Sequence, residues 1–513
     1  MMPVNPSAGR GARILGVLRG CARLGGVLLG GVLPLAGCVM LPPHPTAYAP
    51  VAAGRLGLSG AAVRPAPDTW WRALGDQQLD ALMAEALSGN PTLAEANARW
   101  QSALAQAAGA RAAQLPDARL RGGETALKVP DGFGPYLLGG HDIWLGNLGA
   151  VLSWDPDLAG EHADQAAAAR SLARAAELDR ADARLLLTGA VAEAYLDLDR
   201  AYALEDIAAD TRAQRARILE ITRRRLAAGL DTRVELREAQ GELPQAQTAL
   251  LQAVAAQALA RHELAALIGR GADAYAGIGR PHLNPTVVLP LPPALPINLL
   301  ARRPDVIAAR ERIEAADAQR RAARAAFYPS INLSALAGFA SVSLSQLISA
   351  QSLGYGAGAA LSLPLFDAGR LRAQYRGAEA HLDGAVADYD ATVLAAVHQA
   401  ADQLTQIDAL GAQLQQQAQW LTDSQEAYRL DEERYRAGLA SYLSVLNAET
   451  EVFNARRQNV ELGSARASAR IALLVALGGS FQPPGAAPAL AADLGAANGT
   501  GARLATLSAA AAR

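Results

Sequence analysis

Four short stretches of the chain alternate apolar side chains with small or polar ones. In the clearest of them, Leu333 and Phe339 fall on one face, while Asn332 and Ser334 fall on the other. A period of two residues is typical of a β-strand whose two faces have different surroundings. The pattern predicts strands at about residues 118–127, 145–155, 331–340 and 355–365. The first of these is the weakest, because Glu124 lies on the face that should be apolar.

The segments that follow these strands are much longer and contain almost no proline. After Pro156 the next proline is Pro244, and after Pro364 the next is Pro483. Long helices are therefore expected at about residues 159–228, 231–268, 368–437 and 440–478. A segment of about 70 residues forms about 100 Å of helix, which no compact domain requires. From Val386 to Ile407 the apolar residues recur every 3.5 residues on average, which is the spacing of a coiled-coil seam.

The second half of the chain repeats the first. Pro91 matches Pro304 at a shift of 213 residues, and Gly229 matches Gly438 at a shift of 209. Because the shift changes between the end of the first helix and the start of the long helix, a loop should absorb the difference. Each half has a helix of roughly 25 residues, two strands and two long helices. We predict a first repeat over residues 69–270, a connector over 271–303 and a second repeat over 304–480.

The N-terminus has the layout of a secretory signal. Four arginines without acidic residues precede an apolar stretch that is too short to span a bilayer stably. It ends in Leu35-Ala36-Gly37-Cys38, which resembles the lipobox of bacterial lipoproteins, where the cysteine is acylated. Residues 1–37 are thus expected to be a signal peptide, and residues 38–68 a linker anchored through lipid on Cys38. The tail, residues 481–513, is expected to be disordered.

Composition excludes several classes of protein. The net charge of -2 and the interleaving of arginine with acidic residues argue against a nucleic-acid partner. Cys21 lies within the expected signal peptide, so the mature chain would have no disulfide. The sequence contains no metal-binding His-Glu-x-x-His motif, phosphate loop or nucleophile elbow. We therefore expect neither an enzyme nor a metal or other cofactor, apart from the lipid on Cys38.

Four strands with one apolar face fit a bilayer only if their edges are paired. An open edge would leave backbone groups without partners in hydrocarbon, at a cost of several kcal/mol each. Three copies of the chain would supply about twelve strands, within the range of outer-membrane barrels. The predicted fold class is mainly α with a small β part, in which a trimer forms a 12-stranded membrane β-barrel continuous with an α-helical barrel.

Three motifs resemble those of the outer membrane factors, the TolC-like proteins, and within them the lipidated OprM/NodT-type branch. They are Leu299-Leu300-Ala301-Arg302-Arg303-Pro304-Asp305-Val306, Leu363-Pro364-Leu365-Phe366-Asp367-Ala368-Gly369-Arg370 and Arg434-Tyr435-Arg436-Ala437-Gly438-Leu439-Ala440-Ser441-Tyr442-Leu443. The resemblance implies a homotrimeric outer-membrane duct with a large periplasmic part. It also implies docking to a periplasmic adaptor (membrane fusion protein) and coupling to an inner-membrane pump of the resistance-nodulation-division type. The duct would carry drugs or other small molecules.

The expected reversals between long helices are candidate docking sites for the adaptor. Gly229, Leu230, Gly438 and Leu439 would expose small and apolar groups there. The alternative is that these residues only form the turns, since glycine favours the positive φ that ends a helix. One residue can serve both purposes.

Three residues are candidates for a periplasmic gate. In some members of the family that the chain resembles, the position that matches Asn447 is an aspartate that forms an acidic ring, and the position that matches Leu443 forms an apolar ring. Asn447 lacks the charge, and the equivalent position in the first repeat is Glu238. We hypothesise that Glu238 supplies a cation-attracting ring instead. The alternative is a solvated charge on a helix surface.

Arg302, Arg303, Pro304 and Asp305 are assigned to structure rather than to contact with cargo, because proline and aspartate both suit the first turn of a helix. Two other functions stay open from the sequence. One is the outer-membrane duct of a type I protein secretion system, and the other is a lipid-anchored coiled-coil protein that forms no channel.

Overall fold

A computed structural model describes residues 56, 58, 65–128, 142–283, 294–296 and 298–482. The expected signal peptide, Cys38 and all but the first two residues of the expected tail lie outside these residues.

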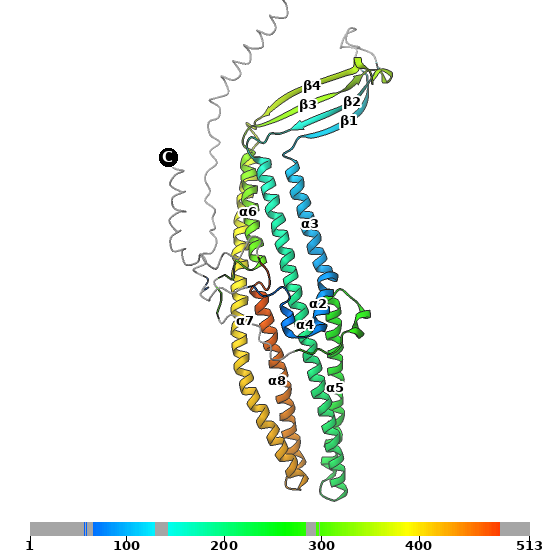
Figure 1. Ribbon diagram of the computed structural model, residues 1–513, viewed down its shortest axis with the longest axis vertical. Helices are drawn as coiled ribbons and strands as arrows, with labels where there is room; N and C mark the ends of the chain where they lie inside the picture. The colour runs from blue at the N-terminus through cyan, green and yellow to red at the C-terminus, as the bar shows by residue number, and fades with distance from the viewer. Residues whose placement is uncertain are drawn as a thin grey trace, which may run out of the picture. The chain divides into compact units, whose positions relative to one another are not determined.

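Six helices form two matching sets of three, coloured from blue to green and from green to red in Figure 1. Their bounds are α3 Pro91–Ala112, α4 Glu161–Ala227, α5 Arg233–Leu267, α6 Pro304–Ala325, α7 Arg370–Arg436 and α8 Tyr442–Ala476. The first helix of each set has 22 residues, the second 67 and the third 35. The repeat is therefore exact in helix length, and the length change between the halves falls among the strands and their loops, as expected.

The four expected strands are β1 Asp117–Lys128, β2 Asp142–Trp154, β3 Ser330–Ser341 and β4 Leu353–Ser362. The prediction extended the fourth strand to residue 365, but the structure ends it before Leu363. Pro364 explains the difference, because proline has no N–H to continue the ladder. The shorter elements are η2 Trp70–Leu74, α2 Gln77–Gly89, η5 Ala272–Gly277, η6 Leu344–Gln346 and η7 Ala350–Ser352.

The strands form one antiparallel sheet in the order β1-β2-β3-β4. The register places like residues side by side: Leu148 of β2 is opposite Phe339, and Leu152 is opposite Ala335. The apolar faces predicted for separate strands thus join into one face, and Glu124 lies on it opposite Gly146, as expected. The other face carries mainly small and polar residues, with a few larger apolar ones such as Leu145, Val151 and Leu336.

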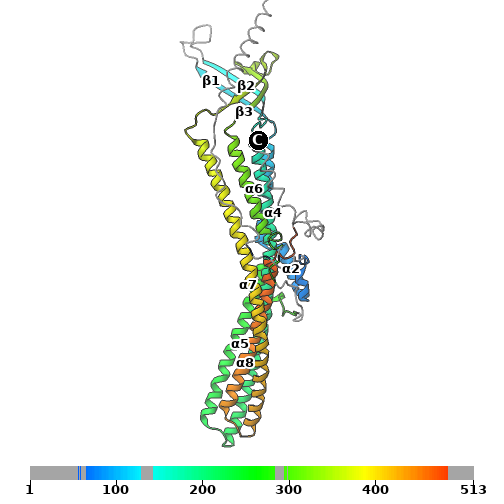
Figure 2. The ribbon, with the colours of Figure 1, turned by 90° about the vertical axis from the view of Figure 1, so that its left-hand side faces the viewer.

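The helices also pack in a fixed order. Next to the sheet the order is α3–α4–α6–α7, and toward the helix reversals it is α5–α4–α8–α7. Both views show the sheet at one end of the helices and the α4–α5 and α7–α8 turns at the other (Figure 1, Figure 2). Along α7, Val386, Val393 and Ala400 of the predicted seam are buried. None of the helices in the described ranges combines the length and the apolar character needed to cross a membrane.

The sheet and both orders of helices therefore each begin with an element of the first repeat and end with an element of the second. Among the described elements, β1, α3 and α5 lie at one edge, and β4 and α7 lie at the other.

Two glycines hold the centre of the sheet. Gly338 of β3 pairs with Gly149 of β2, and a Cβ on Gly338 would lie 2.3 Å from the Gly149 Cα. We expect Gly338→Ala to destabilise the protein by about 1–3 kcal/mol, because the strands would have to separate. Thermal unfolding in detergent, followed by circular dichroism, measures this loss. Gly354→Ala is the matched control, since nothing lies within 4 Å of a Cβ there; an equal loss in both variants would contradict the close-packing argument.

Candidate functional site at the hairpin tips

The two long hairpins reverse through the same glycine turn. Gly229 and Gly438 have φ of +76° and +77°, a conformation that favours glycine. In both turns the next residue, Leu230 or Leu439, donates its N–H to a carbonyl of the last helical turn, at 2.9 Å and 2.8 Å. These two leucine residues are 65% and 72% exposed. The expected docking residues thus form a pair of equivalent turns that carry exposed apolar side chains.

Polar contacts join one hairpin to the other just above these turns. Tyr435 of α7 donates its hydroxyl to Asp231 Oδ2 at 2.8 Å, and Arg225 of α4 binds the same carboxylate at 3.0 Å. The Arg225 guanidinium also donates to the Tyr435 carbonyl at 2.9 Å and lies 4.3 Å from the centre of its ring. Arg225 and Asp231 are both largely buried. We call Arg225, Asp231 and Tyr435 the tip triad.

An apolar cluster supports the tip triad from the side of the sheet. It consists of Ile218, Leu219, Ala239, Tyr435, Tyr442 and Val445, which come from all four long helices. Because Tyr435 belongs to both groups, moving the second hairpin away from the first would disrupt the polar contacts and the apolar contacts together.

The residues expected at a gate are exposed. Leu443 and Asn447 lie one turn apart on α8, and Leu443 is 57% exposed. Glu238 is exposed at the equivalent position of α5, and Val234, which is 64% exposed, is the equivalent of Leu443. Each hairpin therefore presents an apolar residue followed one turn later by a polar one. Within the described residues no hydrogen bond or ion pair joins Glu238 to Asn447.

The sequence interpretation missed the tip triad and Val234. A signal was present in the repeat, since Tyr435 replaces Leu226 and Asp231 replaces Ala440 at equivalent positions. Tyr435 and Asp231 both differ from their equivalents in the other repeat, and their side chains can hydrogen-bond with each other. This pattern indicates a contact between the two hairpins.

A buried ion pair links the same helices farther from the tips. Arg215 Nη1 of α4 lies 2.7 Å from Glu449 Oε2 of α8, and the Glu449 side chain is only 1% exposed. The contact has the distance of an ion pair when Glu449 is ionised, but it lacks hydrogen-bond geometry. Arg215 also lies 3.8 Å from Glu242 of α5 and donates to the Thr450 hydroxyl at 3.3 Å.

The surroundings of Glu449 disfavour its charge. Burial raises the pKa of Glu449 to about 7, although Arg215 acts in the opposite direction. The nearby carboxylates of Glu242 and Glu432 raise this pKa further, and Arg217 lowers it.

The Arg302-Arg303-Pro304-Asp305 motif lies at the start of α6 and contacts the end of α8. Arg303 binds Asp305 at 2.6 Å and donates to the Ala476 carbonyl at 3.1 Å. Arg302 donates to the Gly479 carbonyl at 3.0 Å. Pro304 occupies the first turn of α6. These contacts join the start of α6 to the end of α8; whether the motif also contacts cargo stays a prediction.

Among the described residues, no group of three or more His, Cys, Asp or Glu side chains is placed to hold an ion.

Comparisons with known proteins agree with this architecture. Residues 82–270 and 295–479 match the model of a family described as outer membrane efflux protein, one segment for each repeat. The chain belongs to the outer membrane efflux protein family. It is 38% identical to the fusaric acid resistance protein FusA of Burkholderia cepacia, over 68% of each chain. It is 32% identical to the multidrug resistance outer membrane protein MdtP of Escherichia coli, over 80% of this chain and 86% of MdtP.

Among solved structures, the outer membrane protein VceC of Vibrio cholerae superposes with a TM-score of 0.77 at 34% identity. The match covers 81% of this chain and all of VceC. The family, the mainly helical fold with a small sheet, the efflux function and the outer-membrane location are thereby confirmed.

The raised pKa of Glu449 predicts how stability depends on pH. Between about pH 4.5 and pH 7 an unfolded chain would ionise this carboxyl while the folded chain keeps it protonated, so stability falls as pH rises, by up to about 1.4 kcal/mol per unit. We expect Glu449→Gln to remove much of this fall. Melting temperatures from pH 5 to pH 8 measure it. Glu242→Gln removes only a secondary contribution to this pKa, so it should retain most of the fall, because burial is the main cause. Equal profiles for both variants would refute the assignment of the fall to Glu449.

Proposed function

We propose that this chain is the outer-membrane duct of a tripartite efflux system and that it works as a homotrimer. The observation that carries this proposal is the matching pair of open edges. The sheet ends in β1 and β4, and the helical layers end in α3 or α5 on one side and α7 on the other. A copy placed beside this one can pair β4 with β1 and α7 with both α3 and α5. Such head-to-tail contacts form a closed ring when the rotation closes.

Closure explains the two faces of the sheet. The apolar face would contact lipid, and the small and polar face would line a water-filled lumen, as in outer-membrane barrels. Three chains supply twelve strands, whereas two chains supply only eight. Side chains would largely fill the interior of an eight-stranded barrel. A protein that only anchors a coiled coil has no need for such a sheet.

The partners follow from membership of the family. A periplasmic adaptor docks at the turns of Gly229, Leu230, Gly438 and Leu439, and an inner-membrane pump of the resistance-nodulation-division type delivers small molecules. Lipid on Cys38 adds a membrane anchor, which mass spectrometry of the mature N-terminal peptide would test. The chain itself performs no chemical reaction; it provides the path.

The experiment that tests this function uses the full-length protein purified in gentle detergent. We expect a trimer by light scattering and discrete conductance steps in planar bilayers. A monomer that leaves bilayers silent would overturn the proposal.

The tip triad holds the periplasmic end closed. Tyr435→Phe removes the hydrogen bond to Asp231 and keeps the aromatic ring beneath Arg225. Loss of a hydrogen bond to a charged group costs about 1.5–3 kcal/mol, which is enough for roughly a tenfold rise in the open population. Single-channel recording should show longer and larger openings. Tyr389→Phe is the control, because Tyr389 lies on α7 in a different cluster and its variant should behave as wild type. Identical recordings for Tyr435→Phe and wild type would show that the tip triad does not hold the channel closed.

Glu238 places three carboxylates near the constriction and attracts cations. We expect Glu238→Gln channels to lose part of their cation preference, because neutralising a charged ring lowers the local concentration of counter-ions. The reversal potential in a KCl gradient measures this change. Glu220→Gln, an exposed glutamate of α4 already paired with arginine, is the control. An unchanged preference in Glu238→Gln would leave Glu238 as an ordinary surface charge.

A further inference from the structure

Charge on the polar face of the sheet is confined to one strand. Among the described residues of the four strands, the titratable side chains on this face are Asp117, Arg119 and Arg121, all on β1. The equivalent residues of β3 are Ser330, Asn332 and Ser334, which are polar but neutral. The charges are therefore a specific feature of the first repeat and are not needed to form the strand.

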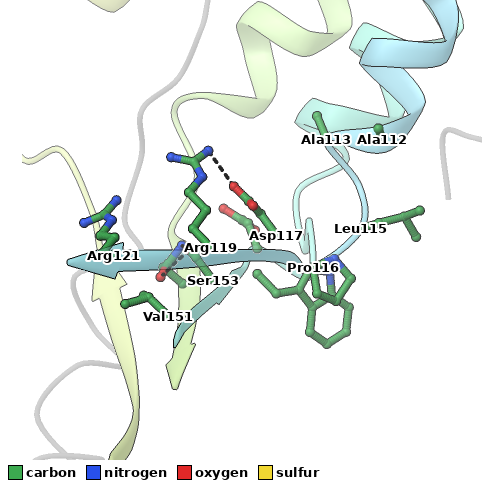
Figure 3. Close-up of a pocket in the computed structure, with 12 residues that line it drawn as sticks. Ala112, Ala113, Leu115, Pro116, Asp117, Arg119, Arg121, Val151 and Ser153 are labelled. Carbon is green, nitrogen blue, oxygen red and sulfur yellow. Dashed lines mark hydrogen bonds and ion pairs between the residues drawn. The ribbon is translucent and has the colours of Figure 1, made fainter. Parts of the chain in front are cut away.

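Two of the three charges cancel. Arg119 Nη2 lies 2.5 Å from Asp117 Oδ2. Figure 3 shows Arg119 and Arg121 on the same side of β1, with only Arg119 joined to Asp117 by a dashed line. Within the described residues Arg121 is exposed and has no ion-pair partner. One uncompensated positive charge per chain remains on this face.

The row of the sheet that contains Arg121 leaves room for its side chain. The residues in register with it are Gly149 on β2, Gly338 on β3 and Gly354 on β4. These three glycines place no side chain on the polar face, so the guanidinium is the only side chain of this row. A cavity of about 620 Å³ lies between this face and the end of α3, and Arg119 and Arg121 both line it (Figure 3).

We propose that Arg121 is a selectivity-determining residue of the duct, where three copies form a ring of guanidinium groups that favours the passage of anions. The proposal rests on the proposed trimeric function, because only closure of the sheet turns its polar face into a lumen. Arginine keeps its charge at every physiological pH, and its planar fork suits carboxylates and phosphates. At the level of the sheet this ring favours small organic or inorganic anions, and its effect is opposite in sign to that of the ring proposed for Glu238 at the tips.

The size of the effect follows from Coulomb attraction in salt water. Three unit charges within about 10 Å of the axis, screened at 0.1 M salt, change the ratio of anion to cation permeability roughly two-fold. The effect should shrink at 1 M salt, where the screening length falls to about 3 Å. A change of pore shape would have no such dependence on salt.

The test uses full-length trimers of four variants in planar bilayers with a KCl gradient. Arg121→Ser introduces the residue that the second repeat carries at the equivalent position, so the sheet should accept it, and Arg121→Gln is an alternative that keeps more of the side chain's length. Arg121→Lys keeps the charge. Asp117→Asn combined with Arg119→Gln removes a neutral pair from the same strand without changing the net charge.

We expect the chloride-to-potassium permeability ratio to fall roughly two-fold in Arg121→Ser and Arg121→Gln at 0.1 M salt. The ratio should stay at the wild-type value in Arg121→Lys and in the double variant. Conducting channels with an unchanged ratio in Arg121→Ser and Arg121→Gln would overturn this inference while leaving the duct intact. A fall of equal size in Arg121→Lys would also overturn it, since shape would then be the cause. Wild-type protein that never conducts would instead refute the proposed function.

Discussion

Backbone hydrogen bonding at the edges of the sheet is the constraint on which the other features depend. The outer edges of β1 and β4 carry N–H and C=O groups that need partners, and an apolar environment offers none. A single chain cannot satisfy them, because its four strands form an open sheet. The helices have open edges on the same two sides, with α3 and α5 on the side of β1 and α7 on the side of β4. One head-to-tail contact between copies therefore completes the sheet and both helical layers together.

The internal repeat explains why the layers match, and its departures indicate where function lies. Corresponding helices have equal lengths of 22, 67 and 35 residues, so each half contributes the same scaffold. Two groups of equivalent positions that differ in charge or polarity lie at the tips and on the polar face of β1. Because the two halves share one scaffold, a residue can differ between equivalent positions without changing the packing. In a trimer, each set of six equivalent positions would then alternate between two residue types.

Much of the fold could be predicted from the sequence, because strands and long helices are local patterns. The alternation around Phe339 and the proline-free segment after Pro364 are each read from neighbouring residues. The contact between Arg225 and Tyr435 could not be read in this way, since 210 residues separate them and only the packing of two hairpins brings them together. The pair of Arg215 and Glu449 is a similar case, because nothing in the local sequence marks either residue as buried.

That buried pair constrains how the tips can move. A buried ion pair contributes little net stability, because removing two charges from water offsets their attraction, but losing one partner is strongly destabilising. If α8 slid along α4 by one turn, about 5.4 Å, Arg215 and Glu449 would no longer be in contact. An opening of the tips that keeps this contact would preserve the register of these helices at Arg215. Such an opening would confine motion to the segments beyond Arg215, where the tip triad and the proposed gate residues lie. The hairpins would then separate near their ends while the helices nearer the sheet keep their packing.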